Sequence, residues 1–210
     1  RLYMLQRMTA LLMALIRRQG KSTKNLRGCI GMDSLHTLAT EGTFPRSLKG
    51  AYNRMAQLMI WAKKYAPQIH TLNIHSQPYH NGGGNAVQEV AFTLANGIAY
   101  VEAAIDAGLK VDEFGPRLSF FFNSHNDFFE EIAKIRATRR IFARMMRDEF
   151  GAKTERAESL TMTCHTSGIA LTAQQPFNNI VRGAIQCMAL VMAGIQAVEI
   201  SAFDEPFRTP

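Results

Sequence analysis

The chain has 210 residues, of which 47% are hydrophobic, 20% charged and 9% aromatic. This composition excludes a disordered chain, a collagen and a coiled coil, and the length suits one domain or a large part of one. With 24 Lys and Arg against 17 Asp and Glu, the net charge of +7 favours anionic partners without choosing among them.

Strands and helices are predicted to alternate along the chain. Helices are expected at residues 2–18, 48–65, 86–107, 128–150 and 177–193, and strands at residues 26–30, 71–75, 117–122, 160–164 and 198–203. Gly108 is a favoured residue after a helix, and Asn126 or Asp127 can cap the fourth helix. A loop with three glycines is expected at residues 76–85. This alternation predicts an α/β fold with a parallel sheet and right-handed crossovers, without an internal domain boundary.

The ends of the chain suggest neither a membrane span nor a signal peptide. The apolar segment 8–16 is shorter than a membrane span, and its basic residues Arg17 and Arg18 follow the segment instead of preceding it. We therefore expect a buried helix and no membrane partner. Because the chain starts with Arg1 and stops at Pro210 just after a predicted strand, we expect a fragment of a longer protein.

Several predicted strands place small or polar residues on one face only. Thr71, Asn73 and His75 alternate with apolar residues, as do Thr161, Thr163 and His165, and Arg117 and Ser119 do the same. A parallel sheet covered on both faces would be apolar on both. A barrel with a ligand channel along its axis explains the pattern, and a single helical layer with a wet opposite face is the alternative.

Polar residues also follow each predicted strand. They recur at five strand ends, where α/β folds place their sites: Asp33; Ser76, Gln77 and His80; Asn123, Ser124 and His125; His165, Thr166 and Ser167; Asp204 and Glu205.

Other motifs in the sequence do not indicate a specific site or partner. The Gly82–Gly84 run lacks the residues of a phosphate-binding motif and is typical of a flexible turn. His75 and His80 have no third ligand at a metal-site spacing, so we expect no metal site. The arginines between residues 136 and 147 are typical of a solvated helix face, and we expect no nucleic-acid partner. The three cysteines include no Cys-x-x-Cys pair, which favours a reducing compartment, and we expect a cytoplasmic protein.

Longer strings resemble the adenosylcobalamin-dependent acyl-CoA mutases, the methylmalonyl-CoA mutase type. They cover most of the chain: residues 86–97 (AVQEVAFTLANG), 107–117 (AGLKVDEFGPR), 117–122 (RLSFFF), 127–140 (DFFEEIAKIRATRR), 165–168 (HTSG), 171–182 (LTAQQPFNNIVR) and 203–205 (FDE). The resemblance implies a (β/α)8 TIM barrel whose axis is threaded by the CoA thioester. This chain would supply strands four to eight with their helices as part of a single barrel domain, and the cobalamin-binding domain would lie outside it.

The resemblance also implies a chemistry and a set of partners. Adenosylcobalamin would provide a radical that rearranges the carbon skeleton of an acyl-CoA such as methylmalonyl-CoA or succinyl-CoA, while the protein positions the acyl group and excludes water. The implied partners are the acyl-CoA substrate, a cobalamin-binding domain or subunit, and a homologous chain in a homo- or heterodimer.

Site residues follow from the positions that match the family. Glu205 matches a glutamate near the deoxyadenosine ribose, and His165 falls where the methylmalonyl enzyme has a substrate-facing glutamine. Arg117 and Ser119 match residues that hold CoA, and Gln196 matches a family glutamine near the site. We take His165, Glu205 and His80 as catalytic candidates, the first two also as cofactor-binding, and these as substrate-binding: Arg117, Ser119, Asn73, His75, Gln77 and Gln196.

Three positions depart from the family pattern. In an ungapped register Gly31 replaces the substrate glutamine, Glu41 replaces the arginine that grips the substrate carboxylate, and Gln77-Pro78 replaces the Tyr-His pair at the thioester. Local gaps would allow Arg46 to replace the arginine, or His80 the thioester donor. Residues 27–33 (RGCIGMD) and 77–80 (QPYH) instead resemble the non-catalytic small subunit of a heterodimeric mutase. A non-catalytic subunit that stabilises a catalytic chain is therefore the alternative.

Overall fold

The computed structural model describes residues 2–43 and 47–207. Within these ranges every strand pair is parallel, and neighbouring strands follow chain order in two sheets, β1-β2 and β3-β4-β5-β6. The strands are β1 (Gly28–Cys29), β2 (Ile69–His70), β3 (Leu72–His75), β4 (Leu118–Ser124), β5 (Thr161–Thr166) and β6 (Ala197–Glu199). Only Thr71 separates β2 from β3, so the chain passes directly from the first sheet into the second.

Five long helices follow the strands or precede them. They are α1 (Leu2–Arg18), α3 (Leu48–Tyr65), α5 (Ala86–Asp106), α7 (Phe128–Arg144) and α9 (Asn178–Ala193). Shorter helices are α2 (Ser34–Glu41), α4 (Gln77–Asn81), α6 (Val111–Phe114) and α8 (Glu155–Glu158). Side-chain caps explain several starts: Asn85 and Gln88 form a capping box on α5, and Asp127 accepts from the Glu130 amide at the start of α7.

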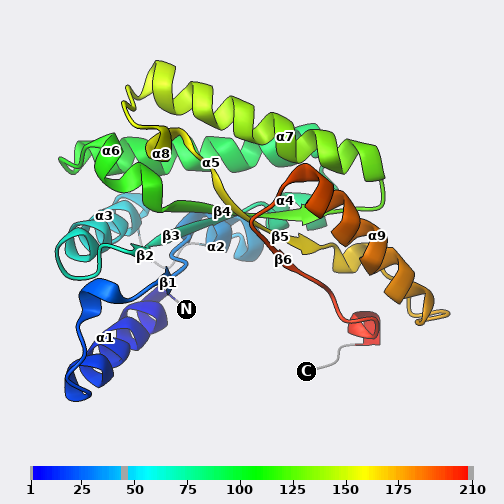
Figure 1. Cartoon of the computed structure of the whole chain (residues 1–210), viewed down its shortest axis with the longest axis horizontal. Coiled ribbons are helices and arrows are strands. Elements are labelled where there is room, and N and C mark those ends of the chain that lie inside the picture. Colours follow the sequence, from blue (N-terminus) through cyan, green and yellow to red (C-terminus); the bar gives the residue numbers. More distant parts are fainter. Residues whose placement is uncertain (1, 44–46, 208–210) are drawn as a thin grey trace.

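The helices cover one face of the strands. In Figure 1, α5 and α7 lie side by side above the sheet, α3 packs against α5 and α9 against α7. Beneath them lies the main core, which includes Leu72, Ile74, Phe120, Phe122 and Met162, all fully buried. The apolar set of strand residues therefore faces the helices, as the alternation predicts.

The sequence-based prediction of an α/β fold with parallel strands is confirmed, and several boundaries need correction. The third predicted strand starts at Leu118, because Gly115 and Pro116 form a 3-10 turn that includes Arg117. The last strand ends at Glu199, because the amide of Ser201 bonds to the Thr166 hydroxyl in place of a backbone carbonyl. The predicted loop at 76–85 contains the short helix α4.

The apolar segment of α1 is buried on one side only, which corrects the prediction of a buried helix. Met13 and Ile16 pack against Ala66 and Ile69, while these side chains are exposed: Met8, Leu11, Leu12 and Leu15. Over residues 2–43 and 47–207 no single helix is both long and apolar enough to span a membrane. One pair bent by 113°, Ala86–Asp106 with Val111–Arg117, meets these criteria jointly, by length and composition only.

Two helical glycines provide a matched test of the packing. A Cβ at Gly97 would lie 3.1 Å from the ring of Phe120, which is fully buried and held by Phe142 at a centroid distance of 5.4 Å. A Cβ at Gly183 would meet Ile200 at an ordinary 3.5 Å. Overpacking in a core costs about 1–3 kcal/mol, more than the gain of about 1 kcal/mol from helix propensity.

We therefore expect Gly97→Ala to lower the free energy of unfolding by about 1 kcal/mol, and Gly183→Ala to leave it unchanged or raise it by up to about 1 kcal/mol. Urea denaturation followed by circular dichroism measures both. Equal changes for the two variants would show that α5 does not pack tightly on β4.

Candidate functional site

The face of the sheet away from α5 and α7 carries mostly polar side chains, of which Ser119 and Asn123 are buried and the others half-buried. The ladder places Asn73, Ser119 and Thr161 side by side in one row. The next rows toward the carboxyl ends hold His75, Phe121 and Thr163, then Asn123 and His165. The polar residues of β3, β4 and β5 thus lie on a common face, as the sequence predicts.

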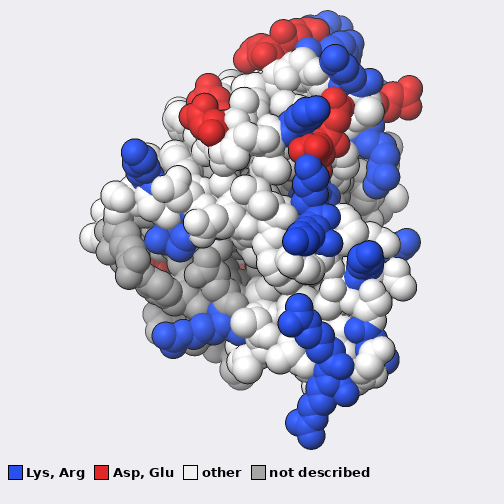
Figure 2. Space-filling model, turned by 90° about the vertical axis from the view of Figure 1, so that its left-hand side faces the viewer, with Lys and Arg blue, Asp and Glu red and all other residues white. Residues whose placement is uncertain are grey.

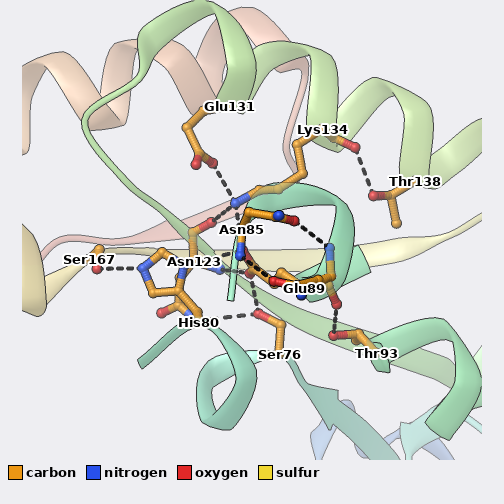
Figure 3. Close-up of polar contacts among 11 residues, drawn as sticks. Ser76, His80, Asn85, Glu89, Thr93, Asn123, Glu131, Lys134, Thr138 and Ser167 are labelled. Atoms are coloured by element: carbon orange, nitrogen blue, oxygen red, sulfur yellow. Dashed lines mark hydrogen bonds and ion pairs between the residues drawn. The ribbon is translucent and has the colours of Figure 1, made fainter. Parts of the chain in front are cut away.

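A buried ionic cluster lies at the carboxyl ends of these strands (Figure 3). Lys134 of α7 donates to Glu89 of α5 at 2.8 Å and to the Asn123 carbonyl at 2.7 Å, and it pairs with Glu131 at 2.6 Å. The other oxygen of Glu89 accepts from the Ser76 hydroxyl at 2.5 Å. The cluster therefore connects β3, β4, α5 and α7.

The two carboxyls that contact Lys134 differ in their pKa. Burial works to raise the pKa of Glu89, but hydrogen bonds from His80, Lys134 and Ser76 outweigh it and bring the pKa to about 2. Burial raises the pKa of Glu131, and contact with Lys134 does not fully offset this effect. The difference arises because Glu89 has several further donors. Glu89 therefore stays ionised beside the buried ammonium, which also contacts Glu131.

His80 belongs to this cluster and does not face open space. Its Nδ1 lies 3.2 Å from Glu89 and its Nε2 lies 2.8 Å from the Ser167 hydroxyl. The side chain is 6% exposed. With both ring nitrogens occupied, His80 has no free position for a ligand in this arrangement, and it positions Ser167 instead.

His165 and Glu205 meet at a small polar cavity of about 170 Å³. The cavity is lined by Gln77, Asn81, Asn123, His165, Gly168, Ile169, Glu205 and Pro206. Nε2 of His165 lies 3.0 Å from the Ser201 hydroxyl. Glu205 begins the 3-10 turn η5 (Glu205–Phe207) and is exposed, close to Gly168. Three predicted site residues, Gln77, His165 and Glu205, are thus brought together.

Other predicted residues lie toward the opposite end of the sheet. Arg117 precedes β4, where one guanidinium nitrogen donates to the Glu113 carbonyl at 2.6 Å and Nη1 is buried without a hydrogen-bond partner. Burial lowers the pKa of Arg117, and nearby Glu113 opposes this effect. Ser119 donates to the Leu72 carbonyl at 2.8 Å and lies 3.1 Å from Asn73.

Gln196 also lies at that end, just before β6. Its Oε1 accepts from the Met162 N–H at 3.2 Å, and its Nε2 donates to the Leu160 carbonyl at 3.1 Å. Both polar atoms of the Gln196 side chain therefore bond to backbone groups at the start of β5. A role in substrate binding stays a prediction.

His75 lies at the end of β3 beside Asp33 and His36, whose sequence spacing does not indicate a metal site. Asp33 caps α2, and its carboxylate accepts from the His36 amide at 3.0 Å, the Tyr100 hydroxyl at 2.7 Å and the His75 amide at 2.8 Å. The ring centroids of His36 and His75 lie 4.9 Å apart. Burial works to raise the pKa of Asp33, but these bonds and the His75 side chain lower it.

The amino-terminal part of the chain carries the excess of positive charge. Residues 1–88 hold 12 of the 24 Lys and Arg but only two acids, Asp33 and Glu41. On the face shown in Figure 2, acidic side chains gather in the upper part, and Lys and Arg predominate in the lower part. An anionic group would be attracted to this end of the molecule.

Sequence reasoning missed the centre of the site. In the sequence, the spacing of Glu89, Lys134 and Glu131 is that of ordinary helix residues. The one signal that could have indicated their role is a charge on the side of a helix that is otherwise apolar and covered. Of the departures from the family pattern, Gly31 has a positive φ of 66° and Glu41 is exposed at the end of α2. Arg46 lies outside the described residues.

Comparisons with known proteins agree with the resemblance. A family model described as methylmalonyl-CoA mutase matches residues 4–210. The chain is 38% identical over 192 residues to methylmalonyl-CoA mutase of Escherichia coli (strain K12), covering 91% of this chain and 27% of that protein, and 36% identical to the human mitochondrial methylmalonyl-CoA mutase, with 91% and 26% coverage. It is 34% identical to the 2-hydroxyisobutanoyl-CoA mutase large subunit of Aquincola tertiaricarbonis, with 96% and 36% coverage. The chain thus spans about a quarter to a third of these curated relatives.

The depressed pKa of Glu89 predicts a loss of stability in acid. A carboxyl with a lowered folded-state pKa stabilises the fold fully above its ordinary pKa near 4.5 and loses that contribution as pH falls toward 2. For this shift the contribution is about 3 kcal/mol. The difference in unfolding free energy between the unchanged protein and Glu89→Gln should therefore shrink by about that amount between pH 6 and pH 2.

Urea denaturation at several pH values measures the difference. Glu130→Gln, which removes an exposed carboxylate from the neighbouring helix α7, is the control and should follow the unchanged protein across the range. If the unfolding free energies of the unchanged protein and Glu89→Gln changed in parallel with pH, the assigned ionic role of Glu89 would be contradicted.

Proposed function

The chain belongs to the methylmalonyl-CoA mutase family, and we propose from this membership that it forms part of the substrate-binding barrel of a cobalamin-dependent acyl-CoA mutase. In this proposal residues 1–210 contribute strands four to eight of a (β/α)8 barrel, with their helices. The reaction is the rearrangement of the carbon skeleton of an acyl-CoA. The observation that carries the proposal is the shared polar face of β3, β4 and β5.

The strand order supports a barrel segment. The strands follow one another in chain order with helices on one face, as they do around a barrel wall. The opposite face is too polar for a packed barrel interior, which is normally filled by Val, Ile and Leu. A polar ligand along the axis accounts for this difference.

The positions of the site residues support an extended ligand. Arg117 lies before β4, and Asn123 lies near its carboxyl end, so a molecule that reaches both must extend about 20 Å. The buried, unpartnered Nη1 of Arg117 suits a phosphate oxygen of CoA. Asn73 and Ser119 between the two ends suit the amides of a pantetheine arm, and His75 and Gln77 lie where the acyl group would arrive.

The residues at the small cavity fit the ribose of adenosylcobalamin. A carboxylate and an imidazole suit ribose hydroxyls, and Gly168 leaves room because a Cβ there would overlap the Glu205 carboxylate. When bound, this cofactor supplies the radical chemistry. Its cobalt would be held by a domain outside this chain. Glu205 and His165 would orient the ribose and the acyl group, and His80 would fix Ser167 beside them.

The relatives do not favour a non-catalytic subunit, since their names are those of mutases and of one large subunit. A homologous chain and a cobalamin-binding domain or subunit remain the proposed partners. We propose a cytoplasmic location from the cysteine content, although several relatives are named as mitochondrial.

The activity is tested with the full-length protein loaded with adenosylcobalamin and a panel of acyl-CoA esters. We expect cofactor-dependent isomerisation of at least one branched acyl-CoA. Because Glu41 stands at the position of the carboxylate-binding arginine, esters without a free carboxylate should have a kcat/KM at least about tenfold above methylmalonyl-CoA. Absence of turnover with every ester while the cofactor is bound would overturn the proposal.

Arg117 provides a test of the ligand path. Arg117→Ala should raise KM for the acyl-CoA by about 10- to 100-fold with little change in kcat, because it removes a charge-assisted contact that is the same in ground and transition states. With the acyl-pantetheine, which lacks the phosphates, the effect should fall below about threefold. Arg140→Ala on the exposed side of α7 removes the same charge and should change neither constant. An undiminished effect on the pantetheine ester would show that Arg117 does not bind phosphate.

A further inference from the structure

Three metal-ligating side chains meet where β1 and β3 end. In Asp33, His36 and His75 one potential ligand atom of each residue lies within 4.8 Å of the others. Asp33 is buried, and the two histidines are half-buried. We propose that these residues bind a divalent first-row transition-metal ion, of the kind that zinc represents.

The separation between His75 and Asp33 suits a common centre. Zinc binds His nitrogen and carboxylate oxygen at about 2.0–2.2 Å, so two tetrahedral ligands lie about 3.4 Å apart. Nδ1 of His75 lies 3.5 Å from Oδ2 of Asp33, which is close to that separation and long for a hydrogen bond. This nitrogen is buried without a hydrogen bond and faces the Asp33 oxygen that would bind the same ion.

The surrounding hydrogen bonds hold the carboxylate as a ligand requires. Oδ1 of Asp33 accepts from the Tyr100 hydroxyl and the His36 amide, and Oδ2 accepts from the His75 amide. Tyr100 is itself fixed by the Leu35 amide at 2.7 Å. Hydrogen-bonded ligands of this kind are typical of metal sites, in which outer residues orient the inner ones.

The donor set selects the class of ion. Two imidazoles and one carboxylate favour zinc, nickel, copper or iron over magnesium and calcium, which prefer oxygen ligands. Three protein ligands leave one tetrahedral position for water or an oxygen of a bound molecule. The side chain of His75 is 24% exposed, so an ion has access from solvent.

The site lies beside the proposed acyl end of the ligand path but does not depend on that proposal. Its binding is measured without any turnover. Failure to bind metal would leave the mutase proposal intact, and loss of mutase activity would leave the metal site intact.

The test is isothermal titration calorimetry, in which Zn²⁺ is added to the metal-free, full-length protein in a buffer that contains excess Mg²⁺. We expect one Zn²⁺ per chain, and at least tenfold weaker binding in His36→Gln and in His75→Gln, with circular dichroism to confirm folding. His125→Gln replaces a histidine outside the cluster and should bind like the unchanged protein. No saturable binding, or equal affinity in all three variants, would overturn the proposal.

A second measurement needs no variant. Zn²⁺ should protect His36 and His75 of the unchanged protein from diethyl pyrocarbonate, as mapped by mass spectrometry, while His125 reacts equally with and without metal. Protection of His125 alone, or of no histidine, would also overturn the assignment.

Discussion

The contact between Glu89 and Lys134 is the interaction on which the carboxyl ends of the strands depend. Both side chains are 1% exposed, and each would be strongly destabilising if buried alone. Together they join α5 to α7, and their remaining hydrogen bonds reach Ser76 after β3 and the backbone of Asn123 in β4. A buried ion pair adds little net stability over an apolar pair, but it permits few alternative arrangements. The cluster thus fixes where the strand ends lie relative to one another.

The same cluster separates residues that support the site from residues that line it. His80 and Ser167 are buried behind the strand ends and bonded to each other, whereas Gln77, His165 and Glu205 line the small cavity. Strand periodicity brings Asn73, Ser119 and Thr161 to the same face along the sheet, so the cavity continues into a polar surface. An anionic molecule approaching the electropositive amino-terminal half would meet Arg117 at one end and the cavity at the other.

Periodicity was sufficient to predict the long helices, the parallel strands and the polar face, because these follow from local spacing. The start of β4 was misplaced by one residue, since Gly115 and Pro116 favour a turn. The side-chain contacts within the site could not be predicted from the sequence, for a different reason. His80 pairs with Glu89 and Ser167, and His75 with Asp33, through contacts between residues up to 87 positions apart. Side-chain chemistry indicates that such residues need partners, but spacing does not say which partners they find.

One departure from the family pattern, Gly31, lies just after β1 and two residues before Asp33. Gly31 has a φ of 66°, a conformation that favours glycine, so the segment after β1 follows a course that a glutamine at this position would adopt only with strain. Two residues later Asp33 turns its carboxylate to the His75 amide, replacing a backbone acceptor at the end of β3. Gly31 and the cluster of Asp33, His36 and His75 thus lie in one region of the fold, at the ends of β1 and β3. A ligand at these strand ends would meet the imidazoles of His36 and His75 and the carboxylate of Asp33, so under the proposed function these groups would surround the acyl group.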